Sequence, residues 1–312
     1  MELNEKKLIA ISVVILTLIA ALAFLLAQAT LPESQFTPST GYIAVIKIEG
    51  TIAYQTSQLT LFGAASNPDS ISDLIDRARK DNFAKAVVLC IDSPGGSAAA
   101  SEALYFKVKE LASSKPVVAF IREYGTSGAY MVALPSKFII AANSSIVGSV
   151  GVYTSVLTYN SLLEKLGVKV YVYKSGELKD IGSPYREPTQ EEMEIFEKMV
   201  SEIFSSFKER VLAHRNITNS DEVFSGRPFT AREALKLGLV DRVGTYNDAI
   251  ALARNLAGLP ADTPVRELTP PRPGLLQLLL SGISYYQKPP VVPSVEILTV
   301  WPPLTGLQAF PD

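Results

Sequence analysis

The sequence predicts an α/β domain built around a largely parallel sheet. Short apolar runs rich in branched residues alternate along the chain with segments of helical periodicity, which is typical of repeated βαβ units. Hydrophobic residues make up 47% of the 312 positions. A chain of this kind can bury the core of one domain of about 200 to 250 residues.

Six apolar runs are expected to form strands, because strands buried on both faces are short and continuously apolar. Three segments between them are expected to be helices: Ser70–Lys80, Ala98–Leu111 and Ala129–Leu134. Since helices and strands alternate, the strands should run parallel. The predicted strands are Ile43–Ile48, Ala86–Ile91, Val117–Ile121, Phe138–Ala141, Ile146–Val152 and Val168–Tyr173.

A long amphipathic helix is predicted from Glu191 to His214, where apolar residues recur at steps of three and four. Thr189 and Glu192 have the spacing of a capping box at its start. Thr230 and Glu233 repeat this spacing before a shorter predicted helix.

The N-terminal region contains an uncharged run of twenty residues, Leu8–Ala27. At about 1.5 Å per residue, a helix of this length crosses about 30 Å of hydrocarbon. Lys6 and Lys7 precede the run and the next basic residue is Lys47, so we expect the short N-terminus in the cytoplasm and the domain on the extracytoplasmic side. Ala27-Gln28-Ala29 has the form of a signal peptidase site, but the run is longer than a usual signal-peptide core. The pattern favours a retained single-pass anchor in the cell membrane over a cleaved signal sequence.

Prolines are concentrated near the C-terminus of the sequence. Eleven of the 20 prolines lie in residues 260–312, which is not typical of a regular α/β core. We expect an anchor or signal sequence at 1–29, a linker at 30–40, the α/β domain at 41–258 and a proline-rich tail at 259–312.

Composition excludes several classes of function. The net charge is −2 and the basic residues are scattered, so no stripe for a nucleic-acid backbone is expected. Cys90 is the single cysteine, which excludes an intrachain disulfide. The chain has no His-Glu-x-x-His or Cys-x-x-Cys motif, and we expect neither a metal nor another cofactor.

Two glycine-containing loops follow successive predicted strands. Pro94-Gly95-Gly96 comes after the strand ending at Ile91, and Gly125-Thr126-Ser127-Gly128 comes after the strand ending at Ile121. Alone, each loop is more typical of an ordinary tight turn. Together they favour a nucleophilic Ser127 at a strand-to-helix elbow, with an oxyanion hole formed by the backbone N–H groups of Gly95, Gly96 and Gly128.

A serine nucleophile needs a base to accept its proton. The single histidine, His214, lies at the end of the long predicted helix, where a solvated or dipole-compensating role is more typical than catalysis. A lysine is the remaining common base, provided that it is neutral. Lys179 fits a partly buried position, but Lys174, Lys169 and Lys165 are nearby, and spacing does not rank the four lysines.

Taken together, these motifs resemble the signal peptide peptidase A family of membrane-bound serine/lysine proteases, which are related in fold to Clp protease and crotonase. The resemblance spans roughly residues 41–253. Its carriers are Ile91-Asp92-Ser93-Pro94-Gly95-Gly96, Thr126-Ser127-Gly128-Ala129-Tyr130, Val147-Gly148-Ser149-Val150-Gly151-Val152, Lys179-Asp180-Ile181-Gly182-Ser183-Pro184, and Gly226-Arg227 with Gly238-Leu239-Val240-Asp241.

The resemblance implies a spiral of βαβ repeats, Ser127 as nucleophile, Lys179 as base and Ser149 as a hydroxyl that orients the lysine. For Ser149, an ordinary turn between glycines is an equally good interpretation. The resemblance also implies a ring-shaped homo-oligomer in which the lysine reaches a neighbour's serine, and substrates that are short hydrophobic peptides such as cleaved signal peptides. Thr126 and Ala129 depart from the family pattern of alanine and glycine, which could narrow the substrate pocket.

Three alternatives remain at this point. A stomatin-partner type of membrane serine protease would act on one specific membrane protein. A crotonase-like acyl-CoA enzyme would share the oxyanion glycines but would need neither an anchor nor a serine/lysine pair. A membrane scaffold would keep the fold without catalysis.

Overall fold

The computed structural model describes residues 13–20, 41–54, 65–270 and 297–300. The chain divides into two compact units, Met1–Ser39 and Thr40–Asp312. In the first unit, residues 13–20 are helical. No helix within the described residues is long and apolar enough to cross a bilayer. Most of the predicted span Leu8–Ala27 lies outside the described residues, so the anchor stays a prediction.

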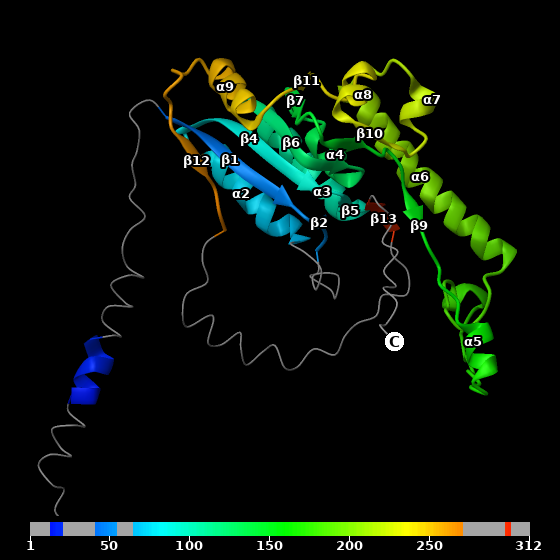
Figure 1. Cartoon of the computed structure of the whole chain (residues 1–312). Helices are drawn as coiled ribbons and strands as arrows, with labels where there is room; N and C mark the ends of the chain where they lie inside the picture. Colours follow the sequence, from blue (N-terminus) through cyan, green and yellow to red (C-terminus); the bar gives the residue numbers. More distant parts are fainter. Residues whose placement is uncertain (1–12, 21–40, 55–64, 271–296, 301–312) are drawn as a thin grey trace, which may run out of the picture. The chain divides into compact units, whose positions relative to one another are not determined.

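A mixed α/β fold forms the second unit (Figure 1). In the described part of the chain, eight strands make the main sheet in the order β10-β8-β6-β4-β1-β12, with β7 paired to β6 and β11 paired to β7. Every pairing is parallel except that of β10 with β8. The strands are β1 (Tyr42–Glu49), β4 (Ala84–Ser93), β6 (Val117–Thr126), β7 (Phe138–Ala141), β8 (Ile146–Gly148), β10 (Pro228–Thr230), β11 (Arg242–Val243) and β12 (Val265–Glu267).

Helices cover both faces of this sheet, as expected for βαβ units (Figure 1). One apolar cluster joins one face of the strands to α2, α3 and α4, and a second joins the other face to α9. Asn67 caps α2 and Ser97 caps α3 through side-chain oxygens that accept backbone N–H groups. These helices are α2 (Pro68–Lys80), α3 (Ala98–Ala112), α4 (Gly128–Ala133) and α9 (Tyr246–Leu256).

The long helix α6 (Gln190–His214) confirms the predicted amphipathic segment, and it begins with the predicted capping box of Thr189 and Glu192. Phe207 and Val211, near its end, are buried in the main core. The second predicted capping box opens α8 (Ala231–Lys236), after the short helix α7 (Ser220–Val223).

The segment from 155 to 187 leaves the sheet and extends away from it in the region of α5 (Asn160–Lys165) and the 3-10 helix η2 (Glu177–Asp180) (Figure 1). We call this segment the arm. The predicted strand Val168–Tyr173 is wrong: these residues are in the arm without regular structure, and Tyr173 is 94% exposed. A strand requires a neighbour for its backbone groups, and no described strand pairs with these residues.

The proline-rich tail contributes two strands, contrary to the expectation that it lies outside the core. β12 pairs with β1 and covers an edge of the main sheet. β13 (Ile297–Val300) joins a smaller sheet of order β3-β2-β5-β13-β9. The expectation failed because prolines break regular structure locally but leave short segments between them free to pair. The other members are β2 (Thr51–Ile52), β3 (Ala65–Ser66), β5 (Gly95–Ser97) and β9 (Tyr153–Thr154).

Candidate active site

Ser127 lies at the turn where β6 ends and α4 begins. Its backbone has φ 52° and ψ −120°, a left-handed conformation that costs a non-glycine residue about 1 to 3 kcal/mol. The turn is held by two backbone bonds: Ser127 N–H donates to the Gly148 carbonyl at 2.7 Å, and Met131 N–H donates to the Ser127 carbonyl at 3.0 Å. The surrounding fold therefore imposes the strained elbow that the sequence predicts for a nucleophile.

The register of the sheet brings three loops together at Ser127. Ser93 at the end of β4 is opposite Gly125 of β6, and Thr126 of β6 is opposite Gly148 of β8. Because parallel strands end at the same edge of a sheet, the loops that follow β4, β6 and β8 converge there. Ser127 itself is only 2% exposed within the isolated chain.

Glycine is required at both positions after β4, at Gly95 by the backbone conformation and at Gly96 by the closeness of the β2 backbone. Gly95 has φ +102°, a conformation that L side chains rarely adopt. A Cβ on Gly96 would lie 2.0 Å from the Ile52 carbonyl oxygen of β2, so any side chain would collide with backbone. These constraints allow β5 to pass beside β2 and to present its other edge to β13.

The three predicted oxyanion donors are in different situations. Gly128 is the first residue of α4, where an N–H group has no acceptor within the helix. Gly96 is in β5 between β2 and β13. Gly95 N–H donates to the Ser93 hydroxyl at 3.2 Å, and Ser93 is fully buried. The role of all three as oxyanion donors stays a prediction, and Gly95 would first have to exchange its present acceptor.

Two polar residues of the quoted motif, Asp92 and Ser93, hold the loop after β4, although the sequence assigned no role to them. Ser93 does so through the Gly95 bond. The Asp92 carboxylate accepts from Arg122 Nε at 2.9 Å and from the Tyr124 N–H at 3.2 Å, which ties the ends of β4 and β6 together. The position of both residues beside the glycine motif could have suggested a role in holding the loop. The partners of Asp92, however, are about 30 residues away in the sequence and cannot be identified from spacing.

The hydroxyls of Ser127 and Ser149 have separate partners. Ser127 Oγ donates to the Gly151 carbonyl at a long 3.4 Å. Ser149 has φ 51°, and its Oγ donates to the Gly226 carbonyl at 3.0 Å. Within the described residues no hydrogen bond joins Ser149 to Lys179, so its orienting role stays a prediction.

Lys179 lies on η2 in the arm, and its side chain is exposed. Its backbone N–H donates to the Gly176 carbonyl at 3.1 Å, but across the part of the chain that the structure describes, no hydrogen bond or ion pair joins its side chain to Ser127 or to any other residue. The chain thus brings Ser127 together with the predicted oxyanion glycines but not with the predicted base.

The competing lysines differ from Lys179 in their surroundings. Lys174 Nζ donates to Asp180 Oδ1 at 2.9 Å, and this bond raises the pKa of Lys174, which holds it in the charged form. Lys165 and Lys169 are exposed on the arm. A cation held by a carboxylate cannot accept a proton, so Lys174 is the weakest of the four as a base.

His214 is half-buried in the last turn of α6, so of the two roles expected for it, the solvated one does not apply. Its Nε2 lies 3.0 Å from the Tyr105 hydroxyl, and burial, followed by nearby Lys109 and Arg215, lowers its pKa. The histidine is therefore neutral at pH 7 and packed against α3. No hydrogen bond links it to Ser127 among the described residues.

Comparisons with known proteins agree with these features. A family model described as peptidase family S49 matches residues 109–260. A putative protease of Methanocaldococcus jannaschii is 43% identical over 189 residues, which are 60% of this chain and 61% of that protein. The chloroplastic serine protease SPPA of Arabidopsis thaliana is 33% identical over 246 residues, 78% of this chain and 36% of that protein.

A third relative, a putative protease of a Synechocystis strain, is 38% identical over 205 residues. The match covers 65% of this chain and 74% of that protein. In contrast, the chain spans less than two thirds of the length of the first two relatives.

Proposed function

Because the chain belongs to peptidase family S49, we propose that it is a membrane-anchored serine endopeptidase in which Ser127 is the nucleophile and Lys179 of an adjacent subunit is the base. The observation that carries this proposal is the strained Ser127 elbow, which backbone hydrogen bonds within the chain hold in place. Groups that the fold holds in position in this way usually contribute the largest part of the rate enhancement in acyl transfer.

The proposed reaction is hydrolysis of a peptide bond through an acyl-enzyme. Ser127 Oγ attacks the carbonyl carbon while its proton passes to the neutral amine of Lys179. The N–H groups of Gly128 and Gly96 would donate to the oxyanion. The lysine then gives its proton to the leaving amine, and a water molecule, activated in the same way, releases the acyl group and restores Ser127.

The position of β13 supports an extended peptide as substrate. This strand of the chain's own tail pairs antiparallel with β5 on one side, where Thr299 is opposite Gly96, and with β9 on the other, where Leu298 is opposite Tyr153. A peptide added between two strands is recognised mainly through its backbone. Recognition of this kind suits varied hydrophobic sequences, such as signal peptides after cleavage, better than a single fixed sequence.

The arm supports a ring-shaped homo-oligomer with a shared site. Among the described residues, the Lys179 side chain has no hydrogen-bond or ion-pair partner in its own chain, and the arm exposes a group of large apolar side chains. Apolar surface of this kind marks an interface. A neighbouring subunit that covers it would bring the lysine to a serine. The exposed large hydrophobic residues of the arm are Leu157, Tyr159, Leu162, Leu166, Val168, Val170, Tyr171, Val172, Tyr173, Leu178 and Tyr185.

The proposal also includes the Clp-protease-like and crotonase-like spiral of βαβ repeats, the single-pass anchor at residues 8–27 and a catalytic domain on the extracytoplasmic side. The successive units β1-α2-β4, β4-α3-β6 and β6-α4-β7 support the repeated architecture. The charge asymmetry around the apolar run supports the orientation.

The experiment that tests the shared site mixes two inactive full-length proteins. We expect Ser127→Ala and Lys179→Ala each to lose cleavage of a fluorogenic apolar peptide. After dissociation and joint reassembly, roughly a quarter of the sites should combine an intact serine with an intact lysine, so cleavage should return. Absence of recovery, with both proteins assembled, would refute the shared site.

A cleavage profile over a peptide library tests the substrate class. Broad cleavage of apolar peptides supports degradation of signal peptides. Cleavage confined to one sequence would favour the type of protease that acts on a specific membrane protein. Full activity of Ser127→Ala would overturn the peptidase mechanism itself, and tight binding of CoA without labelling of Ser127 by a fluorophosphonate would favour an acyl-CoA enzyme.

A further inference from the structure

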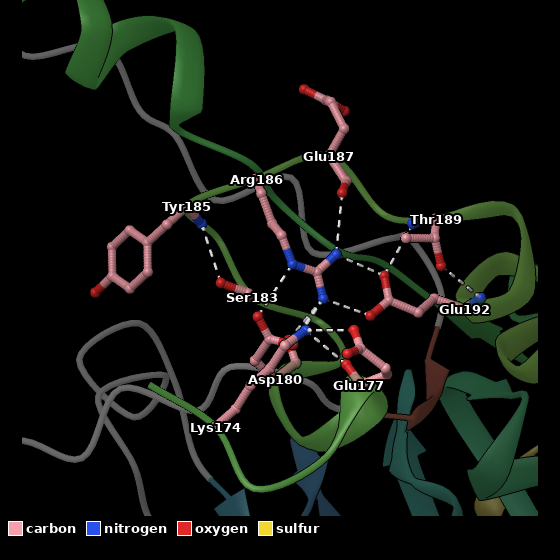
Figure 2. A network of polar contacts seen from close by, with 9 residues as sticks. All are labelled: Lys174, Glu177, Asp180, Ser183, Tyr185, Arg186, Glu187, Thr189 and Glu192. Carbon is pink, nitrogen blue, oxygen red and sulfur yellow. Dashed lines mark hydrogen bonds and ion pairs between the residues drawn. The ribbon is translucent and has the colours of Figure 1, made fainter. Parts of the chain in front are cut away.

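Charged side chains from both sides of the turn that carries Lys179 meet at one carboxylate (Figure 2). Asp180 Oδ1 accepts from Lys174 Nζ and from Arg186 Nη2, both at 2.9 Å, and Asp180 Oδ2 accepts from Arg186 Nε at 3.0 Å. Lys174 also donates to the Glu177 carbonyl at 2.7 Å. Both oxygens of Asp180 are therefore occupied, and the turn is closed from each side.

Arg186 connects this turn to helix α6. Its guanidinium lies between Asp180 and Glu192, as Figure 2 shows, with Nη1 at 2.8 Å from Glu192 Oε2 and Nη2 bonded to Oε1. Glu192 is 1% exposed and also accepts the Thr189 N–H at 2.9 Å in the capping box of α6. A planar guanidinium that contacts two carboxylates in this way sets distance and orientation together.

Arg186 holds these carboxylates in their charged forms. Its hydrogen bonds lower the pKa of Glu192 to about 2. The same arginine, followed by Lys174, holds the pKa of Asp180 well below its usual range. The charged groups around the turn are Lys174, Glu177, Arg186 and Glu192. The two cations among them, Lys174 and Arg186, both form ion pairs with Asp180.

Asp180 is the covalent neighbour of Lys179, yet no ion pair joins the two in the described structure. A carboxylate in contact with a lysine favours its charged form, and a charged lysine cannot accept the serine proton. Because Lys174 and Arg186 already bind the Asp180 carboxylate, that carboxylate is not available to stabilise the charged form of Lys179. The network can therefore fix the place of Lys179 and also keep its amine free of a carboxylate partner.

We propose that Arg186 is a positioning residue for the base: it ties the turn that carries Lys179 to the buried Glu192 and, with Lys174, withholds the Asp180 carboxylate from Lys179. This inference rests on the proposed serine/lysine mechanism. It assigns one task to Asp180, Arg186 and Glu192: they support Lys179, although none of them forms a hydrogen bond or ion pair with its side chain.

The first test replaces Arg186 by a neutral residue of similar length in the full-length protein. In Arg186→Gln, the Asp180 Oδ2 atom loses its donor and becomes available to Lys179. We expect kcat to fall by about 10- to 100-fold with little change in KM. We also expect the rising limb of the pH–activity profile to move to higher pH by about one unit, because more alkaline conditions are needed to obtain the neutral amine.

Three further variants separate this role from general destabilisation. Asp180→Asn combined with Arg186→Gln removes the freed carboxylate, so the pH profile should return to that of the wild type even though kcat stays low. Arg186→Lys should recover part of kcat. Arg79→Gln removes an arginine that forms ion pairs with Asp76 and Glu110 on α2 and α3, and it should leave both kcat and the pH profile unchanged.

The outcomes distinguish failure of the positioning role of Arg186 from failure of the serine/lysine mechanism. If Lys179→Ala retains cleavage, the proposed mechanism is wrong and the positioning role is wrong with it. If Ser127→Ala and Lys179→Ala are inactive while Arg186→Gln keeps the wild-type pH profile, the mechanism stands and the inference is overturned. A circular dichroism spectrum and the oligomeric state of each variant establish that it is folded and assembled.

The mixing experiment gives a second, independent readout. Arg186→Gln is added either to the Ser127→Ala chain, which supplies the lysine, or to the Lys179→Ala chain, which supplies the serine. We expect recovered cleavage to fall by about 10-fold or more in the first combination only. Equal losses in both combinations would overturn the positioning role.

Discussion

The turn at Ser127 and the turn at Lys179 are held in place by different forces. Ser127 is buried at the edge of the main sheet, and backbone hydrogen bonds and the register of three strands determine its conformation. Lys179 is exposed on the arm, and side-chain charges hold the turn beneath it. The proposed nucleophile is thus part of the core, whereas the position of the proposed base depends on a polar network and on the surface that covers the arm.

The largest expected effect concerns the core side of this comparison. Ser127→Ala should reduce peptide cleavage by about 10⁴-fold or more, because the remaining groups act only together with the nucleophile. Initial rates with a fluorogenic apolar peptide give the measurement. Ser113→Ala, at the exposed end of α3, is the control and should retain full activity. Cleavage by Ser127→Ala within about tenfold of the wild-type rate would mean that another residue is the nucleophile.

A matched pair of glycine substitutions compares the two regions directly. Gly96→Ala would place a methyl group 2.0 Å from the Ile52 carbonyl oxygen, so we expect a loss of about 1 to 3 kcal/mol in the free energy of unfolding and a strong loss of activity. Gly176→Ala, in the arm, meets no atom within 4 Å. Its effect on stability should be within about 0.5 kcal/mol.

Chemical denaturation measures both unfolding free energies. Similar values for the two variants would contradict the view that the core holds its turn by close packing and the arm does not.

Acid should weaken the arm before the core. Because the pKa of Glu192 is depressed to about 2, its bond to Arg186 contributes stability that is complete above about pH 4.5 and is lost as pH falls through about 2. We therefore expect Glu192→Gln to destabilise the protein at pH 7 and to differ less from the wild type at pH 3. Limited proteolysis of the arm at the two pH values checks this, and a constant difference would contradict it.

The smallest expected effect is that of His214→Ala. The imidazole is packed against Tyr105 and not against the reacting groups, so activity should change by less than about twofold. Loss of the hydrogen bond to the Tyr105 hydroxyl should cost about 1 kcal/mol of stability. Peptide cleavage and thermal unfolding measure the two effects. Strong loss of activity in a folded variant would make the histidine, and not a lysine, the candidate base.

The core side of the molecule could be predicted largely from sequence. The runs that became β1, β4, β6 and β7 are apolar, apart from Lys47 in β1, because they are buried on both faces. The elbow at Ser127 has its glycine signal on either side. The capping box of α6 is equally local. In each case the residues that determine the structure are neighbours along the chain.

The arm and the tail could not be predicted in this way. Val168–Tyr173 has the composition of a strand, but strand formation depends on a partner that the sequence does not name. β13 pairs with β5 about two hundred residues earlier in the chain. Asp180, Arg186 and Glu192 form one network only because the arm returns to α6, so spacing gave no sign that they act together.

The strained backbone of Ser127 carries a consequence for the evolution of this protein. At φ 52° and ψ −120° a glycine would be relaxed, so Ser127→Gly should unfold at a higher temperature than the active protein although it cannot catalyse. Selection for stability alone would therefore remove the serine. On the proposed mechanism, the serine is kept because activity requires it, at a cost in stability that is concentrated in one peptide unit.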